Sequence, residues 1–223
     1  ANEDRREFAE TLDWSMKIAV LVAVPAAIGL IVLASPLVIT LFMGGVFDER
    51  SAQMTALALR AYAVGLVGFS FVKVLAPAFF AREDTRTPVR IGIVALVVNV
   101  VLGSSSAWYM TVSGMTGPHA ALAAATSVAA LLNAALLYRG LRKAGVIRHS
   151  AGWGVLLARV VLANAVMGFV LATLHRDGSW WGDALLVDRV WWLGVSVVAG
   201  AGAYFVALAV LGVRPQQFRL RQD

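Results

Sequence analysis

Hydrophobic residues along this chain gather in six long blocks, and short polar segments separate one block from the next. The hydrocarbon core of a membrane is about 30 Å thick, so a helix needs about 20 apolar residues to cross it. Blocks of about this length or longer lie at residues 15–43, 54–81, 89–110, 119–138, 154–174 and 190–213. The pattern therefore predicts an all-α polytopic membrane protein with six transmembrane helices.

The composition agrees with this interpretation and excludes several kinds of chemistry. Of the 223 residues, 60% are hydrophobic and 14% are charged, whereas soluble domains carry about 25% charged residues. The chain has no cysteine, which excludes disulfides, thiolate nucleophiles and cysteine-based metal sites. None of the three histidines has a second candidate ligand three or four residues later, so we expect no metal site. Because no Ser/His/Asp set and no glycine-rich phosphate loop stands out, we expect neither enzyme activity nor a cofactor.

Basic residues are distributed unevenly between the two ends of the predicted helices. The net charge of +6 could indicate a nucleic-acid partner, but the placement of the charges favours a membrane topology instead. One side collects Arg5, Arg6, Arg82, Arg86, Arg90, Arg139, Arg142, Lys143, Arg148, Arg214, Arg219 and Arg221, and the other side only Arg50, Arg176 and Arg189. Cytoplasmic loops carry an excess of Lys and Arg. We therefore expect both ends of the chain to be cytoplasmic, with no nucleic-acid partner.

A long connection on the basic side divides the chain into two parts. We expect residues 1–138 to form four transmembrane helices of one lobe and residues 139–153 to form a cytoplasmic loop. Residues 154–213 would then form a final helix pair, and residues 214–223 a cytoplasmic tail. The chain opens with charged residues and no Met, which is typical of an internal loop, so we expect it to be the C-terminal part of a longer protein.

A dense group of charges separates the second and third blocks. Arg82, Asp84 and Arg86 are candidates for a cytoplasmic gate, and the simpler interpretation is that they anchor the topology. Thr87 followed by Pro88 is typical of a helix start, with threonine as the N-cap and proline at the first helical position. We therefore expect a tight hairpin between two helices.

Four cations lie within the predicted helices, where a charge at the bilayer centre costs about 2.5–3.5 kcal/mol. Lys17, Arg60 and Arg159 are close to helix ends, so their side chains can reach the membrane surface. Lys73 lies eight residues before Ala81, or about 12 Å along a helix. No acidic residue lies at the centre of a block. A cavity lined by cations suits an anion such as a pyrophosphate, and Lys73 and Arg159 are the candidate substrate-binding residues.

Prolines and small residues indicate how the predicted helices bend and pack. Pro25, Pro36 and Pro77 each remove a backbone hydrogen bond, and such bends are tolerated in membranes where neighbouring helices cover the freed carbonyl. The bends are either static or part of a transport movement. Small residues such as Gly65 and Gly68 allow close helix contacts and predict a packed bundle.

Tryptophans gather near the predicted membrane surfaces, where indole rings are favoured. Those of the last outer loop are Trp180, Trp181, Trp191 and Trp192, and those of the cytoplasmic surface are Trp14 and Trp153.

Several stretches resemble one transporter family. The segment from Lys73 to Arg90, KVLAPAFFAREDTRTPVR, closely resembles a stretch of the MurJ (MviN) family of lipid II flippases. Leu12-Asp13-Trp14, Ala61 to Leu66, Leu132 to Tyr138 and Ala203 to Gly212 fit the same family.

The resemblance implies part of a fourteen-helix transporter of the MOP superfamily, which is MATE-like, in the bacterial inner membrane. It would flip an undecaprenyl-pyrophosphate-linked peptidoglycan precursor to the periplasmic leaflet, and this chain would supply helices nine to fourteen. Its partners would be that precursor, membrane lipids and the N-terminal helices of the same protein. The final pair, 154–213, would form the groove for the lipid tail. Some members bind sodium through a carboxylate in helix eleven, but the third block offers only Asn99 there, so we expect no sodium site.

Three alternatives remain open from the sequence. One is a flippase for another polyprenyl-pyrophosphate-linked oligosaccharide such as O-antigen, because the anion and the tail are the same. The second is a non-transporting scaffold subunit of a membrane assembly. The third, an intramembrane lipid-modifying enzyme, is disfavoured because no carboxylates or histidines cluster at the membrane surface.

Overall fold

The computed structural model describes residues 2–45, 47–114, 118–147 and 152–213, and all of its named elements are helices. The helices are α1 Asn2–Phe42, α2 Glu49–Phe80, α3 Arg86–Val112, α4 Pro118–Lys143, α5 Trp153–Thr173, α6 Gly178–Asp183 and α7 Leu186–Val210. The predicted tail 214–223, and with it Arg214, Arg219 and Arg221, lies outside the described residues, as does Arg148.

Six of these helices are long and apolar enough to cross a membrane, which confirms the predicted spans; the short α6 is the exception. Helix α1 begins far before its hydrophobic block, because a polar first part continues the helix and carries an ion pair between Arg6 and Glu10 at 3.2 Å. Helix α2 also begins early, since the Asp48 carboxylate accepts a hydrogen bond from the Ser51 backbone N–H at 2.9 Å and caps the first turn.

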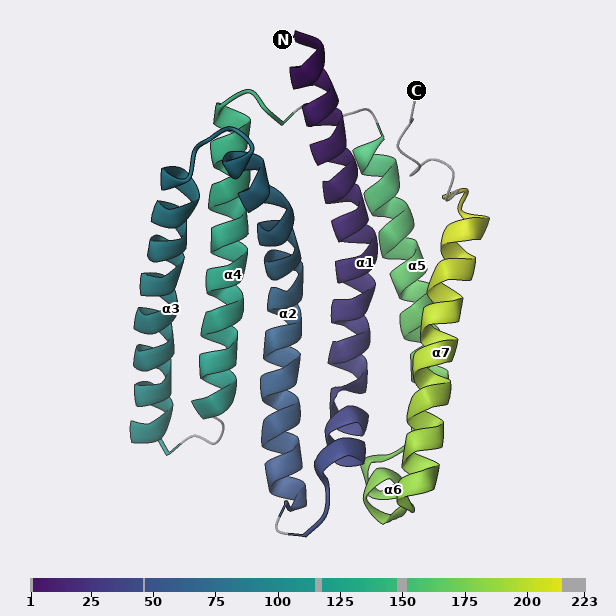
Figure 1. The fold of residues 1–223 in the computed structure, drawn as a ribbon. Coiled ribbons are helices and arrows are strands. Elements are labelled where there is room, and N and C mark those ends of the chain that lie inside the picture. The colour runs from purple at the N-terminus through teal and green to yellow at the C-terminus, as the bar shows by residue number, and fades with distance from the viewer. Residues whose placement is uncertain (1, 46, 115–117, 148–151, 214–223) are drawn as a thin grey trace.

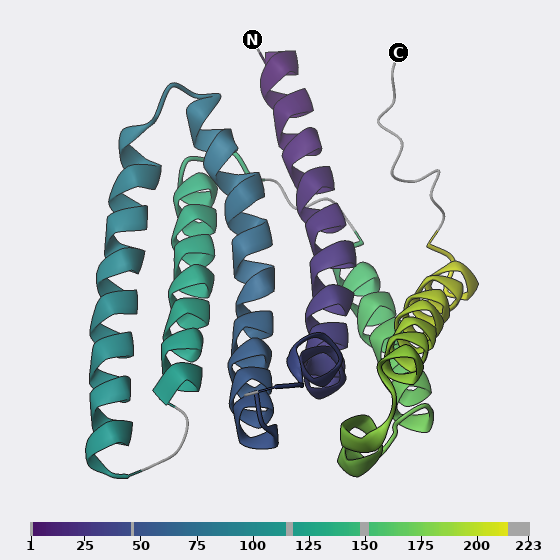
Figure 2. The ribbon, with the colours of Figure 1, turned by 60° about the horizontal axis from the view of Figure 1, so that its bottom comes forward.

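Helix α1 lies at the centre of the arrangement (Figures 1 and 2). On one side α2 packs against both α1 and α4, and α3 packs against α4; on the other side α5 and α7 pack against each other and against α1. The N-terminal end of α1, the turn 81–85 and the C-terminal ends of α4 and α7 all lie at one end of the molecule, and α6 lies at the other (Figure 1).

The contact between α2 and α4 depends on two glycines. A Cβ atom added at Gly65 would lie 2.8 Å from the Cα of Ser127, and one at Gly68 would lie 2.7 Å from the carbonyl carbon of Ala130. The Ser127 hydroxyl also donates to the carbonyl oxygen of Ala61 at 2.6 Å. The predicted close approach of small residues is therefore confirmed for this helix pair.

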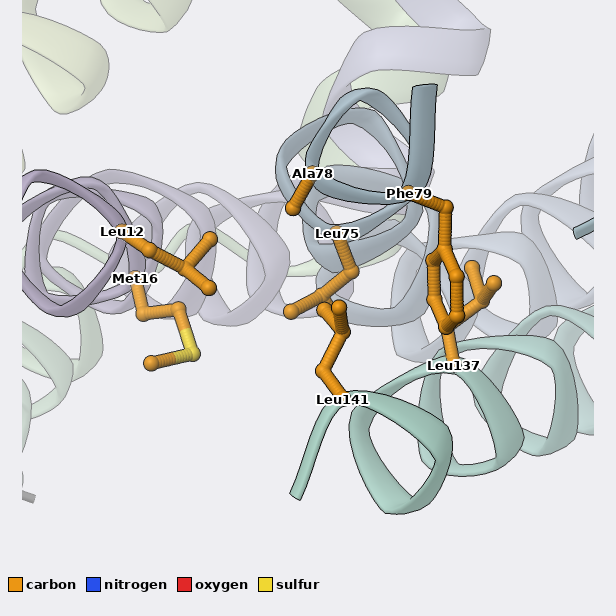
Figure 3. Packing of buried hydrophobic residues seen from close by; sticks show 7 residues of the cluster. All are labelled: Leu12, Met16, Leu75, Ala78, Phe79, Leu137 and Leu141. Carbon is orange, nitrogen blue, oxygen red and sulfur yellow. The ribbon is translucent and has the colours of Figure 1, made fainter. Parts of the chain in front are cut away.

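A hydrophobic cluster joins α1, α2 and α4 near the 81–85 turn (Figure 3). Its buried members are Leu12, Met16, Leu75, Ala78, Phe79, Leu137 and Leu141. These side chains fix the central helix to the α2–α4 pair, so the end of α2 that carries Lys73 is held firmly.

The hairpin between α2 and α3 is tight, as predicted, but its cap was assigned to the wrong residue. Helix α3 begins at Arg86, before Pro88, and the carboxylate of Asp84 accepts a hydrogen bond from the Thr87 backbone N–H at 3.0 Å. That bond lowers the pKa of Asp84 below its ordinary value. The N-cap position is Thr85, whose side chain makes no capping hydrogen bond. The carboxylate of Asp84, one residue earlier, supplies the acceptor, which the helix dipole favours.

The end of α2 also has an unusual residue. Glu83 adopts φ 59°, the left-handed conformation that glycine usually supplies after a helix. Around it, the Asp84 N–H donates to the Phe79 carbonyl at 3.1 Å and the Glu83 N–H to the Phe80 carbonyl at 2.9 Å. This pair of bonds is a Schellman motif, and it turns the chain at once toward α3.

Candidate functional site

Lys73 lies in a groove of about 380 Å³ between α1 and α2. The side chain is exposed there, and in the described part of the chain its ammonium group has no ion-pair partner. The rest of the groove wall is Trp14, Ser15, Ile18, Ala19, Val22, Ala23, Ser70 and Val74. The groove therefore combines one cation with two hydroxyls and an otherwise apolar wall.

A second groove of about 430 Å³ lies on the other side of α1 and is almost entirely apolar. Helix α1 contributes Leu21, Pro25 and Gly29 among others, α5 contributes Leu171, and α7 contributes Gly200. The resemblance implies a lipid-tail groove in residues 154–213, which include α5 and α7, and this assignment stays a prediction. The apolar groove described here takes much of its wall from α1, where Gly29, like Gly200 of α7, adds no side chain to the space.

The walls of the two grooves share one residue. Val22 lines both of them, and its side chain is 61% exposed. The groove that holds Lys73 and the apolar groove therefore border the same position of α1.

Side chains from neighbouring helices bond to α1 beside Pro25 and in the turn before Pro36. Pro25 has no N–H to donate to the carbonyl of Leu21, and the Tyr204 hydroxyl of α7 donates to that carbonyl at 2.8 Å. In the turn before Pro36, the Arg60 guanidinium donates to the carbonyl of Ile31 at 3.3 Å and to the Ser35 hydroxyl at 2.9 Å.

These contacts correct one expectation about the cations. Arg60 was expected to extend to the outer membrane surface, but it is half-buried and bound to α1. An intramembrane guanidinium gains more from a carbonyl and a hydroxyl close at hand than from stretching to a distant interface.

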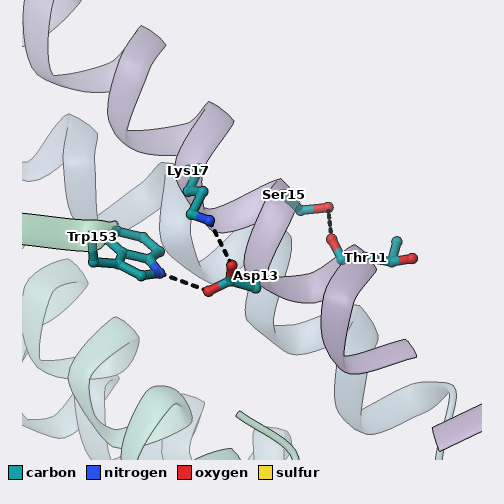
Figure 4. A network of polar contacts seen from close by, with 5 residues as sticks. All are labelled: Thr11, Asp13, Ser15, Lys17 and Trp153. Atoms are coloured by element: carbon teal, nitrogen blue, oxygen red, sulfur yellow. Dashed lines mark hydrogen bonds and ion pairs between the residues drawn. The ribbon is translucent and has the colours of Figure 1, made fainter. Parts of the chain in front are cut away.

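Lys17 is likewise bound within the protein (Figure 4). Its ammonium group lies 2.9 Å from the Asp13 carboxylate, and the Trp153 indole N–H donates to the other oxygen of Asp13 at 2.7 Å. Asp13 is only 5% exposed, so the chain buries a carboxylate just before the first hydrophobic block, although none lies at the centre of a block. The position of Trp153 at the cytoplasmic membrane surface stays a prediction, and its hydrogen bond ties the start of α5 to α1.

Arg159, the second candidate substrate-binding residue, does not line the groove that contains Lys73. Its guanidinium lies at the C-terminal end of α7 and donates to the carbonyl of Gly212 at 3.4 Å, and it lines neither of the two grooves. A cation is favourable beside the free carbonyls of a helix C-terminus. The position of Arg159 therefore favours a role in holding α5 to α7.

The hairpin residues lie at the surface. Arg82 and Arg86 are exposed, and Asp84 between them is engaged in capping α3. This placement leaves the two arginines accessible to lipid headgroups at the end of the molecule where the chain begins (Figure 1).

The tryptophans of the last loop differ among themselves. Trp181 is 4% exposed and packs under the ends of α1 and α2, so it is a core residue and not a surface anchor. The Arg176 guanidinium carbon lies 4.4 Å from the centre of the Trp192 ring and 5.6 Å from that of Trp180, which forms a cation–π cluster.

Comparison with known proteins places this arrangement in a family. The sequence model described as "Lipid II flippase MurJ" matches residues 1–187. A probable lipid II flippase MurJ of Vibrio cholerae is 40% identical over 93% of this chain and 38% of its own length. A probable lipid II flippase MurJ of Haemophilus influenzae is 38% identical over 93% of this chain and 39% of its own length.

A third relative, the lipid II flippase MurJ of Burkholderia cenocepacia, is 36% identical over 98% of this chain and 41% of its own length. The chain therefore spans about 40% of the length of these curated relatives. With a family match over most of its residues and six membrane-spanning helices, the chain belongs to the lipid II flippase MurJ family.

Proposed function

We propose that the protein of which this chain forms part flips a polyprenyl-pyrophosphate-linked peptidoglycan precursor across the membrane by alternating access. The names of the relatives support this activity. A lipid flippase is a transporter, so no covalent chemistry is required of these residues. Because the chain matches about 40% of each relative, the complete activity belongs to the full-length protein.

The observation that carries the proposal is that Val22 lines both the groove of Lys73 and the apolar groove. Lys73 would present positive potential to the pyrophosphate, since an ammonium group suits a phosphate as a point charge. The tail would lie in the apolar groove between α1, α5 and α7. Burial of the apolar tail against this wall is favourable in proportion to the tail surface that is covered.

The other candidate residues receive more limited roles. Arg82 and Arg86 would contact anionic lipid headgroups and brace the cytoplasmic side of the hairpin. Arg159 would act on the substrate only indirectly, through its contact with the end of α7. Residues 1–138 would form part of one lobe, and residues 154–213 the helix pair that completes the tail groove.

We also propose a bacterial inner-membrane location with both chain ends cytoplasmic. The support is the excess of basic residues on the side of the chain ends. The start of α1 and the 81–85 turn lie at one end of the molecule (Figure 1). If this end is cytoplasmic, a precursor made inside the cell enters the groove between α1 and α2 from the side near Lys73.

The test uses the full-length protein in cells depleted of their own lipid II flippase. Lys73→Ala should reduce the precursor that reaches the outer leaflet, and Lys73→Arg, which keeps the charge, should retain most of it. Equal transport by wild type and Lys73→Ala would contradict the role of Lys73. Loss of surface polysaccharide with normal peptidoglycan would indicate an O-antigen flippase, and absence of any precursor binding would indicate a scaffold.

A further inference from the structure

The carbonyl of Leu21 is the starting point. In a regular helix it would accept a hydrogen bond from the N–H of residue 25, but Pro25 has none. Within a membrane no water replaces the missing donor, so a carbonyl left open is costly. A neighbouring helix therefore has reason to supply a donor at this point of α1.

The donor comes from Tyr204 in α7. Its hydroxyl lies 2.8 Å from the Leu21 carbonyl oxygen, and the whole side chain is 1% exposed. The bond links residues 183 positions apart in sequence and joins the central helix to the final helix pair.

The same residues form part of the apolar groove. Leu21, Pro25 and Tyr204 all line it. Along α7, Ser196 and Gly200 precede Tyr204 at intervals of four residues and line the groove as well, so the tyrosine follows the small residues on one helix face. The hydrogen bond thus sits in the wall of the space between α1 and α7.

We propose that Tyr204 is a positioning residue of the tail groove. Its hydroxyl takes the place of the N–H that Pro25 lacks, which holds α7 against α1 beside Pro25 and sets the shape of the groove. The inference rests on the proposed function in one respect, namely that a polyprenyl tail occupies the groove.

The decisive experiment is a double-mutant cycle in the full-length protein. Tyr204→Phe removes only the hydroxyl, and Pro25→Ala restores a backbone N–H for Leu21. Tyr62→Phe is the matched control, because it removes the same group from a side chain of α2 that is 46% exposed. Binding of undecaprenyl pyrophosphate and of water-soluble pyrophosphate is measured for each variant.

We expect Tyr204→Phe to weaken binding of the tailed ligand by about 3- to 20-fold, the range of single hydrogen bonds between membrane helices. In the Pro25→Ala background the same change should cost much less, because Leu21 then has its own donor. Binding of pyrophosphate without a tail, and every property of Tyr62→Phe, should be unchanged. Equal losses in both backgrounds, or no loss in either, would overturn the proposal.

A second readout separates this inference from the proposed function. Spin labels on α1 and α7, without ligand, report the distance between the helices. Tyr204→Phe should lengthen or broaden that distance, and Pro25→Ala should suppress the effect. An unchanged distance would overturn the positioning role alone, whereas failure of the wild type to bind the tailed ligand would count against the proposed function.

Discussion

Replacement of Gly68 by alanine tests the packing that holds α2 against α4. The added Cβ would lie 2.7 Å from the Ala130 carbonyl carbon, 2.7 Å from the Leu131 nitrogen and 2.9 Å from the Ala130 oxygen. All three atoms are backbone, so no side-chain rotation relieves the clash. Since ordinary contacts begin near 3.4 Å, the helices must separate by several tenths of an ångström.

Two effects of opposite sign decide the magnitude. Overpacking of a close contact costs about 1–3 kcal/mol, whereas Gly to Ala in a helix interior gains up to about 1 kcal/mol. We therefore expect Gly68→Ala to lower the free energy of unfolding by about 0–3 kcal/mol relative to wild type. Relative to an uncrowded Gly→Ala control, which shares the helix gain, the loss should be about 1–3 kcal/mol.

Gly92→Ala in α3 is the matched control, because a Cβ there meets no atom within 4 Å. It should be neutral or stabilising. Thermal unfolding of the purified full-length protein in detergent measures both variants. If Gly68→Ala is as stable as Gly92→Ala, the close approach of α2 and α4 is wrong.

Three further changes test the connections at the same end of the molecule. Trp153→Phe removes the indole N–H that donates to the buried Asp13 carboxylate, and should lower stability by about 1–3 kcal/mol in an unfolding titration; an unchanged midpoint would contradict the link. The lowered pKa of Asp84 means that its stabilising effect is complete above the ordinary carboxyl pKa and is lost as pH falls through the lowered value. Asp84→Asn should therefore flatten the acid side of a stability–pH curve, and an identical curve would refute the cap. Glu83→Gly should raise the melting temperature, because φ 59° suits glycine, and a lower melting temperature would refute that conformation.

The number and order of the spans could be predicted because block length alone decides whether a helix crosses a membrane. The ion-pair and hydrogen-bond partners of the charged residues could not be predicted in this way. Lys17 lies close enough to a helix end for both a surface position and an ion pair. The only local signal for the pair was Asp13 four residues earlier, a spacing that brings side chains together on a helix. Trp153, 140 residues away, has no such local signal.

The apolar groove between α1, α5 and α7 also depends on contacts between distant helices, which the sequence does not reveal. Pro25 predicted that a neighbouring helix must cover a freed carbonyl, and Tyr204 does so, but nothing in the sequence named the donor. For the same reason the sequence carried no sign that α1 contributes to the wall of this apolar groove. Helix-helix contacts across the bundle depend on shape complementarity, whereas hydropathy records only which segments enter the membrane.

The central claim is that the tail of a lipid-linked precursor lies between α1 and α7 with its phosphate beside Lys73. The most direct measurement is photocrosslinking of a polyprenyl pyrophosphate, labelled along its tail, to the full-length protein, followed by peptide mapping. The account predicts crosslinks within residues 21–37 of α1 and 196–205 of α7, the stretches that line the groove, and less capture by Lys73→Ala. Crosslinks confined to the exposed face of α3, or spread evenly over all helices, would contradict it.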